Sequence, residues 1–326
     1  MRRLGAGRPA VAALLAALVL GGAVAAVVLG RDDSPPANAR PATASVFAER
    51  RVGQRLLDVN VRSPALGTTA MVRLMTPRGW SRDPGGRTWP VLYLLHGCCD
   101  SYESWTRSTD IEDLRALDGT LVIMPEGGPV GFYSNWADGP AWETFHLDEL
   151  PAILEREYGA GRSRAIAGLS MGGLGAMGYA ARRPGFFRAA ASFSGLLHPL
   201  EDSRLLLGLF SAFTPDALAI WGDPEGDRGT WAEHDPTELA GRLRGTELFV
   251  SSGDGRPGPL DDRGAGRDDT EATVFRESRA FVRRAREHGL PVRTDFYGAG
   301  RHDWPYWQRE LKRALPNLVE APRARR

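Results

Sequence analysis

The sequence predicts an α/β fold in which a mostly parallel sheet carries helices on both faces. Two observations lead to this prediction. Short, nearly continuous apolar runs recur along the chain, and such runs are typical of strands that are buried on both sides. Helical stretches alternate with these runs, and that alternation builds parallel sheets with right-handed crossovers. We expect a single domain over residues 46–320, since α/β domains often reach about 250 residues.

The first 30 residues are predicted to direct the chain to the membrane, either for export or as an anchor. Met1, Arg2 and Arg3 give a positive start, and residues 9–30 form an uncharged stretch long enough to cross a bilayer. Two interpretations fit: a signal peptide that is cleaved after small residues at 37–44, or an uncleaved membrane anchor with the domain outside. Both predict an extracytoplasmic protein. The proline-containing residues 31–45 are predicted to be a flexible linker.

The predicted strands and helices follow from about residue 46 onward. Residues 55–62 and 70–76 alternate apolar and polar positions, which predicts an antiparallel hairpin at the start of the domain. Residues 197–235 interrupt the later alternation and are predicted to be an insertion that shapes a substrate pocket. Buried strands are predicted at 90–95, 120–124, 164–168, 189–193, 247–251 and 292–297, helices at 147–158, 174–183, 271–288 and 304–314, and a basic tail at 321–326.

Composition excludes several classes of function. There are 41 basic and 40 acidic residues, so the net charge of +1 favours no nucleic-acid partner. Lys312 is the only lysine, which argues against P-loop nucleotide binding and Schiff-base chemistry. Cys98 and Cys99 are adjacent and cannot join distant parts of the chain, and we expect two thiols beneath a loop rather than a redox switch. No cofactor or metal ion is predicted.

One motif carries the predicted chemistry. Gly168, Ser170 and Gly172 form a Gly-x-Ser-x-Gly sequence between a predicted strand and a predicted helix. A tight turn there holds Ser170 in a strained backbone conformation and raises its hydroxyl, and a side chain at either glycine would clash. The following helix directs its amides at developing negative charge. Ser170 is therefore the predicted nucleophile, and the α/β-hydrolase fold is predicted.

The serine needs a base and an orienting acid, which follow it in the order acid, then histidine. His302 is the predicted base because it lies in a glycine-rich loop directly after the last predicted strand. The acid stays open on the residues alone: Asp254 lies at a strand end, Glu271 opens the next helix, and Glu277 lies deeper in that helix. Four other histidines are assigned no catalytic role, because of their positions: His146, His198, His234 and His288.

The oxyanion of a tetrahedral intermediate needs two backbone donors. The amide of Met171, next to the serine, is the first. The loop after the strand at residues 91–95 is expected to supply the second, through the amide of Cys98. Four tryptophans are candidates for a surface that contacts an acyl chain or a sugar: Trp136, Trp142, Trp304 and Trp307.

Over about residues 52–311 the chain resembles the actinobacterial antigen-85 mycolyltransferases and the wider putative-esterase family that includes esterase D. The resemblance includes three segments that are not general to the fold, Phe-Tyr-Ser-Asn-Trp at 132–136, Trp-Glu-Thr-Phe at 142–145 and His-Asp-Trp-Pro-Tyr-Trp at 302–307. It implies an acyl-serine enzyme. The residues that it implies are Ser170, Glu271 and His302 for the catalytic triad and Met171 and Cys98 for the oxyanion amides, with Asp254 as the alternative acid.

The chain also departs from the mycolyltransferases. Where they carry an aspartate and an arginine that help to hold trehalose, this chain has His96 and a shorter loop at residues 98–101, and Asp303 replaces the serine after the histidine. The resemblance therefore implies acyl-serine chemistry, whereas it does not extend to the residues that would recognise trehalose. We predict a serine esterase or acyltransferase for lipid or sugar esters, with water or a sugar hydroxyl as acceptor. The alternative is a non-catalytic cell-envelope or matrix-binding protein that retains the fold.

Overall fold

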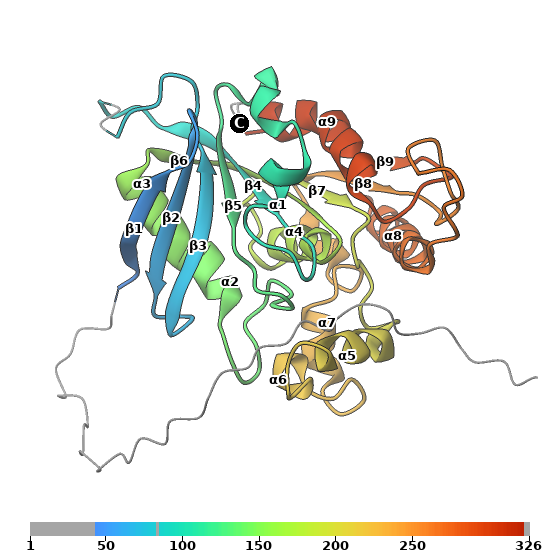
Figure 1. Cartoon of the computed structure of the whole chain (residues 1–326). Helices are drawn as coiled ribbons and strands as arrows, with labels where there is room; N and C mark the ends of the chain where they lie inside the picture. The colour runs from blue at the N-terminus through green and yellow to red at the C-terminus, as the bar shows by residue number, and fades with distance from the viewer. Residues whose placement is uncertain (1–42, 83–84, 323–326) are drawn as a thin grey trace, which may run out of the picture. The chain divides into compact units, whose positions relative to one another are not determined.

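A computed structural model describes residues 43–82 and 85–322, and Figure 1 shows the chain. The strands of the described residues are β1 (Ser45–Arg51), β2 (Leu56–Ser63), β3 (Thr68–Met75), β4 (Trp89–Leu95), β5 (Leu121–Pro125), β6 (Ala160–Leu169), β7 (Ala189–Phe193), β8 (Glu247–Ser252) and β9 (Val292–Phe296). They form one sheet in the order β1-β2-β3-β5-β4-β6-β7-β8-β9. The pairs from β5 to β9 are parallel and the others antiparallel. The predicted mostly parallel sheet is confirmed.

The predicted hairpin and all six predicted buried strands are present, with small shifts at their ends. β2 and β3 pair antiparallel from Leu56 opposite Met75 to Ser63 opposite Thr68. β1 was not predicted, and it begins at Ser45, the last residue of the predicted linker. Most of its side chains are exposed. An edge strand of this kind carries little apolar alternation, so the sequence pattern gives no signal for it.

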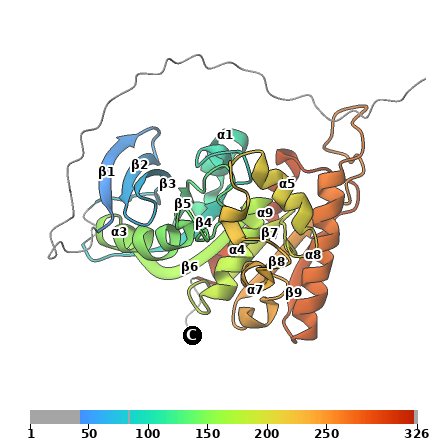
Figure 2. The ribbon, with the colours of Figure 1, turned by 90° about the horizontal axis from the view of Figure 1, so that it is seen from below.

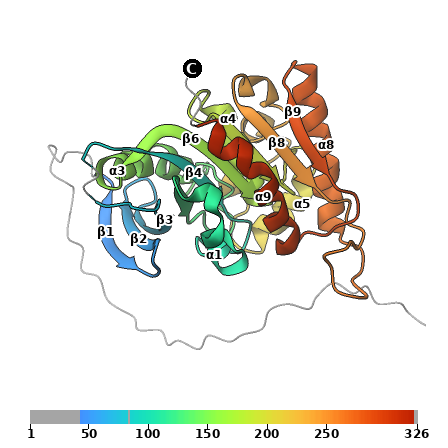
Figure 3. The same ribbon diagram turned by 90° about the horizontal axis from the view of Figure 1, so that it is seen from above.

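Helices cover both faces of the sheet. They are α1 (Ser104–Ser108), α2 (Trp142–Thr144), α3 (Leu150–Glu157), α4 (Met171–Arg182), α5 (Ser203–Ser211), α6 (Leu218–Trp221), α7 (Arg228–Glu233), α8 (Asp269–Glu287) and α9 (Trp304–Glu320), with short 3-10 helices at Ile111–Asp113, Arg115–Leu117 and Ala240–Leu243. α3, α4 and α8 pack on one face (Figure 2), and α1 and α9 pack on the other (Figure 3). Tyr93 of β4 points into the first core and Leu92 and Leu94 into the second. This explains the continuous apolar run in β4.

The helix predicted over residues 147–158 starts earlier in the structure. α2 continues through a π-helical turn at Phe145–Glu149 into α3. Pro151 has no amide hydrogen to donate to the carbonyl of Leu147, so the regular α-helical ladder lacks one hydrogen bond there. A wider turn before the proline keeps the helical path continuous.

The predicted insertion at residues 197–235 contains α5, α6 and α7, which lie together beyond the strands in Figure 1. Phe210, Trp221 and Trp231 bury this segment in the same core as α4. The insertion is therefore an integral part of the fold, and α5 also presents Leu205 to solvent with 57% of its surface exposed.

The predicted targeting segment, residues 1–30, lies outside the described residues. So do most of the predicted linker and residues 323–326 of the predicted basic tail. Within residues 43–82 and 85–322, none of the helices combines the length and the apolar character that crossing a bilayer requires.

Candidate active site

Ser170 stands on the turn between β6 and α4, with a φ of 53° and a ψ of −121°. This left-handed backbone conformation is strained for a serine. A Cβ atom at Gly172 would lie 2.5 Å from the carbonyl oxygen of Leu95, and one at Gly168 would collide with the carbonyl oxygen of Gly172. Both glycines are therefore required at the turn, as the motif predicts.

His302 lies between Ser170 and Glu271. Its Nε2 accepts a hydrogen bond from Ser170 Oγ at 2.9 Å, and its Nδ1 donates to Glu271 Oε2 at 2.8 Å. The serine comes from the turn after β6, the glutamate from the first turn of α8, and the histidine from the loop after β9. The structure thus brings together the three residues that the family resemblance implies.

Glu271 is fully buried and is held by several donors. Its Oε1 accepts from Ser194 Oγ at 2.9 Å, Ser252 Oγ at 2.9 Å and the amide of Gly253 at 2.6 Å. These donors compensate for the loss of water around a buried carboxylate and leave Oε2 to His302. Sequence reasoning missed both serines. Ser194 directly follows β7 and Ser252 is the last residue of β8, and only the parallel pairing of these strands brings the two hydroxyls to the same carboxylate.

The other two acid candidates are engaged elsewhere. Asp254 pairs with Arg256 at 2.6 Å, and this hydrogen bond holds the pKa of Asp254 below its usual value. Glu277 accepts from the amide of His198 at 3.0 Å, and burial raises the pKa of Glu277 well above its usual value. Neither carboxylate takes the position beside His302 that Glu271 occupies.

The two residues predicted to supply oxyanion amides, Met171 and Cys98, both lie close to Ser170 in the fold. Met171 is the first residue of α4, and Cys98 and Ser170 both line one cavity. The structure joins Cys98 and Cys99 in a disulfide, so the expectation of two thiols was wrong. Cys99 adopts a φ of 65° and its amide donates to the carbonyl of Pro129 at 2.9 Å. This tight turn brings the two neighbouring side chains to the same side of the loop.

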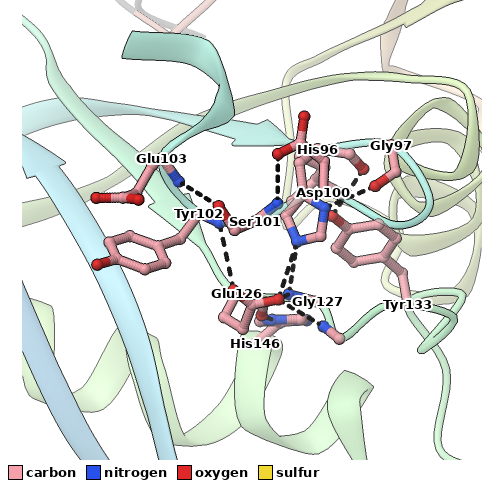
Figure 4. A network of polar contacts seen from close by, with 12 residues as sticks. His96, Gly97, Asp100, Ser101, Tyr102, Glu103, Glu126, Gly127, Tyr133 and His146 are labelled. Atoms are coloured by element: carbon pink, nitrogen blue, oxygen red, sulfur yellow. Dashed lines mark hydrogen bonds and ion pairs between the residues drawn. The ribbon is translucent and has the colours of Figure 1, made fainter. Parts of the chain in front are cut away.

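A network of polar contacts surrounds the loop at residues 96–101, which follows β4 (Figure 4). His96 is 1% exposed, donates from Nδ1 to the carbonyl of Gly97 at 2.7 Å and accepts at Nε2 from the amide of Gly127 at 2.9 Å. The carboxylate of Glu126 accepts from the amides of Gly128 and Tyr102, at 2.9 and 3.3 Å. His96 therefore fixes the loop from within and offers no surface to a substrate.

A cavity of about 480 Å³ opens beside Ser170 and His302. Its walls are mostly apolar, and α5 of the insertion contributes Leu205, Leu206 and Leu209 to them. That this cavity binds substrate remains a prediction. Two of the four candidate tryptophans line it, Trp304 and Trp307. The other two lie elsewhere: Trp142 stacks on His146, and Trp136 donates to the carbonyl of Gly131. The apolar lining residues are Leu169, Leu196, Leu205, Leu206, Leu209, Trp304 and Trp307.

The chain is similar in sequence to known proteins. Residues 63–318 match the family described as putative esterase. The chain is 31% identical over 300 residues to the diacylglycerol acyltransferase/mycolyltransferase Ag85B of Mycolicibacterium smegmatis, with 85% of this chain and 88% of that protein covered. Identity to Ag85A of Mycobacterium tuberculosis is 30% over 335 residues, with 96% and 94% covered.

A solved structure agrees with these sequence relationships. The crystal structure of Mycobacterium tuberculosis MPT51 matches with a TM-score of 0.67 at 27% identity, over 82% of this chain and 99% of that one. The matched family region contains Ser170, Glu271 and His302. The chain therefore belongs to the putative-esterase family, as an ester-acting hydrolase or acyltransferase with the α/β-hydrolase fold.

Proposed function

We propose that the protein is an extracytoplasmic serine esterase or acyltransferase that works through an acyl-serine intermediate. The observation that carries this proposal is the hydrogen-bonded chain from Ser170 through His302 to Glu271, on the wall of an apolar cavity. The location outside the cytoplasm is supported by the uncharged apolar stretch at residues 9–30 after an arginine pair.

In the acylation step, Ser170 Oγ bonds to the ester carbonyl carbon while its proton passes to His302 Nε2. The carbonyl oxygen becomes an oxyanion, which the amides of Met171 and Cys98 bind. Glu271 holds the imidazole ring in place and stabilises its charged form. The bond to the leaving alcohol then breaks, and that alcohol takes the proton from His302.

In the deacylation step, water or a hydroxyl compound attacks the acyl carbon and gives its proton to His302. The bond between the acyl carbon and Ser170 Oγ breaks, and the serine regains the proton. Water yields a free acid, and an alcohol yields a new ester. Hydrolase and acyltransferase thus differ only in the second nucleophile.

The cavity supports an apolar acyl group as the part of the substrate that is bound beside Ser170. Leucines from α5 and the indoles of Trp304 and Trp307 supply this surface. The names of the relatives Ag85A and Ag85B, diacylglycerol acyltransferase/mycolyltransferase, point in the same direction. Trehalose is not proposed as acceptor, because His96 is buried at the position where the resemblance implies a sugar-binding residue.

The nucleophile is tested by the turnover of p-nitrophenyl esters. Ser170→Ala removes the attacking oxygen but keeps the fold, and kcat should fall by about four orders of magnitude or more. Circular dichroism checks folding. Turnover by the folded variant within about tenfold of the wild type would exclude Ser170 as nucleophile.

The acid is tested by a matched pair of neutral substitutions. Glu271→Gln should lower kcat by about 10⁴-fold, since the acid orients the imidazole and stabilises its charge. Asp254→Asn removes a carboxylate from the loop between β8 and α8 and should leave kcat within about twofold. The reverse order of effects would assign the acid to Asp254.

Product analysis separates hydrolysis from transfer. A long-chain ester is turned over with and without a sugar or glycerol acceptor, and the free acid and the new ester are quantified. A growing share of new ester identifies a transferase, and free acid alone identifies a hydrolase. If a folded wild-type chain turns over no ester in either condition, the non-catalytic binding protein is the better account.

A further inference from the structure

We propose that Asp268 is a positioning residue that sets the geometry between Glu271 and His302 by holding the backbone of both. This inference rests on the proposed function of the same site. Asp268 Oδ1 accepts from the amide of Glu271 at 3.0 Å, and Oδ2 accepts from the amide of His302 at 3.0 Å. One carboxylate thus binds the acid and the base directly, although they lie 31 residues apart in the chain.

Asp268 is the N-cap of α8, and Glu271 is the third residue of that helix. An N-cap aspartate followed three residues later by glutamate is the signature of a capping box. In a complete capping box, the glutamate side chain turns back to the amide of the N-cap residue. Here the carboxylate of Glu271 instead contacts His302, so the box is only half formed.

The carbonyl of Gly255 takes the place of the missing glutamate. It accepts from the amide of Asp268 at 2.7 Å, which satisfies the donor that Glu271 would otherwise bind. The carboxylate of Glu271 is then free for the histidine. Asp268 therefore keeps the capping contact that orders the first turn of α8, while the glutamate of the same motif takes a chemical role.

The second carboxylate oxygen of Asp268 makes a contact that helix capping does not require. Capping needs one acceptor, which is Oδ1, whereas Oδ2 accepts from the amide of His302 in the loop after β9. Backbone hydrogen bonds join the same loops nearby, from Gly255 to the carbonyl of Gly300 at 3.0 Å and from Gly300 to the carbonyl of Arg256 at 2.8 Å. The side chain of Asp268 is only 15% exposed, so water competes little for either contact.

The variants Asp268→Ala and Asp268→Asn test this role. Alanine removes both acceptors. Asparagine has one acceptor oxygen, so the amide of Glu271 or of His302 loses its partner whichever way the side chain lies. The matched control is Asp269→Asn, which removes a negative charge from the same helical turn at an almost fully exposed side chain whose ion pair is with Arg267.

Three readouts separate positioning from stability: kcat and KM for a soluble p-nitrophenyl ester, the rate and final extent of fluorophosphonate labelling, and the downfield proton resonance of the His302–Glu271 hydrogen bond. We expect kcat to fall at least tenfold in Asp268→Ala and in Asp268→Asn, with KM changed less than about threefold. Labelling should reach full extent at a slower rate, and the resonance should broaden or vanish. Asp269→Asn should match the wild type in all three.

The proposal is overturned if kcat per labelled site in either folded Asp268 variant stays within twofold of the wild type, even when the melting temperature falls. If Asp268→Ala does not fold, the isosteric Asp268→Asn decides alone. A wild type that neither labels nor turns over ester refutes the proposed function itself, whereas an active wild type with equally active Asp268 variants refutes only the positioning role.

Discussion

The indole of Trp307 meets the imidazole of His302 edge to face, with 4.9 Å between ring centroids and 86° between ring planes. Its Nε1 donates to Ser194 Oγ at 3.2 Å, and the same hydroxyl donates to Glu271 at 2.9 Å. Trp307 thus contacts His302 directly and Glu271 through Ser194. Because Trp307 also lines the cavity beside Ser170, the proposed acyl-binding surface and the proposed catalytic residues meet at this side chain.

Trp307→Phe should lower kcat severalfold, because it keeps a ring against His302 but removes the donor to Ser194. Trp307→Ala should also destabilise the fold by roughly 3–5 kcal/mol, the usual cost of deleting a buried indole. Ester kinetics and urea unfolding measure the two effects. Trp136→Phe is the control, since it removes an indole donor to the carbonyl of Gly131 away from the cavity. Equal kcat for Trp307→Phe and the wild type would contradict the contact's role.

Gly172→Ala should destabilise the protein by about 1–3 kcal/mol and abolish most activity. The new Cβ would lie 2.5 Å from the carbonyl oxygen of Leu95 and 2.6 Å from that of His96, and neither backbone group can rotate away. The control is Gly208→Ala on α5, where nothing lies within 4 Å and helix propensity favours alanine. In urea unfolding, the free energy of unfolding should be lower for Gly172→Ala than for the wild type, and equal or higher for Gly208→Ala.

Leu209→Trp should shift the preferred ester to a shorter acyl chain, because a larger side chain fills the cavity beside Ser170. The measurement is kcat/KM for a series of p-nitrophenyl esters of increasing chain length. Arg204→Trp adds the same indole to the same helix, at a side chain that is 93% exposed and outside the cavity lining. An unchanged chain-length profile in Leu209→Trp would place the acyl group elsewhere.

Glu310 gives the stability of the fold a specific pH dependence. Burial raises the pKa of this glutamate from 4.5 to about 7, although Arg309 donates to it at 2.8 Å. Between these two values the folded state holds a proton that the unfolded state has released, so the free energy of unfolding falls as the pH rises through this range. Glu310→Gln should flatten this slope in urea unfolding measured at several pH values.

Glu320→Gln, which removes an exposed carboxylate from the end of the same helix, is the control for that experiment. A wild type and a Glu310→Gln variant with parallel stability curves between pH 4.5 and 7 would show that burial does not shift the titration of this group.

The sequence predicts the sheet well where both faces of a strand are buried. β4, β7 and the second half of β6 are nearly continuous apolar runs because alternate residues pack into two different cores. β1 has no such signal, since it lies at the edge with exposed side chains. The helical run that ends in α3 begins earlier than its apolar periodicity indicates, because a π-helical turn before Pro151 disrupts the regular spacing.

The candidate site is predicted from the sequence only in part. Gly168, Ser170 and Gly172 form a local motif, so their turn is visible without any long-range information. The choice between Asp254 and Glu271 cannot be made from local sequence, because it depends on how the loops after β8 and β9 meet. The residue pattern leaves that choice open and the family resemblance favours Glu271. The donors Ser194 and Ser252 have no sequence signal, whereas Asp268 has one in its capping-box spacing.

Covalent trapping tests the central claim most directly. The wild-type chain is treated with a fluorophosphonate, its intact mass is measured, and the modified peptide is identified by tandem mass spectrometry. We predict a single adduct on Ser170 that Ser170→Ala abolishes and that prior incubation with a long-chain ester slows. An adduct on another residue, or none on the folded wild type while a known serine esterase is labelled in parallel, would contradict the acyl-serine account.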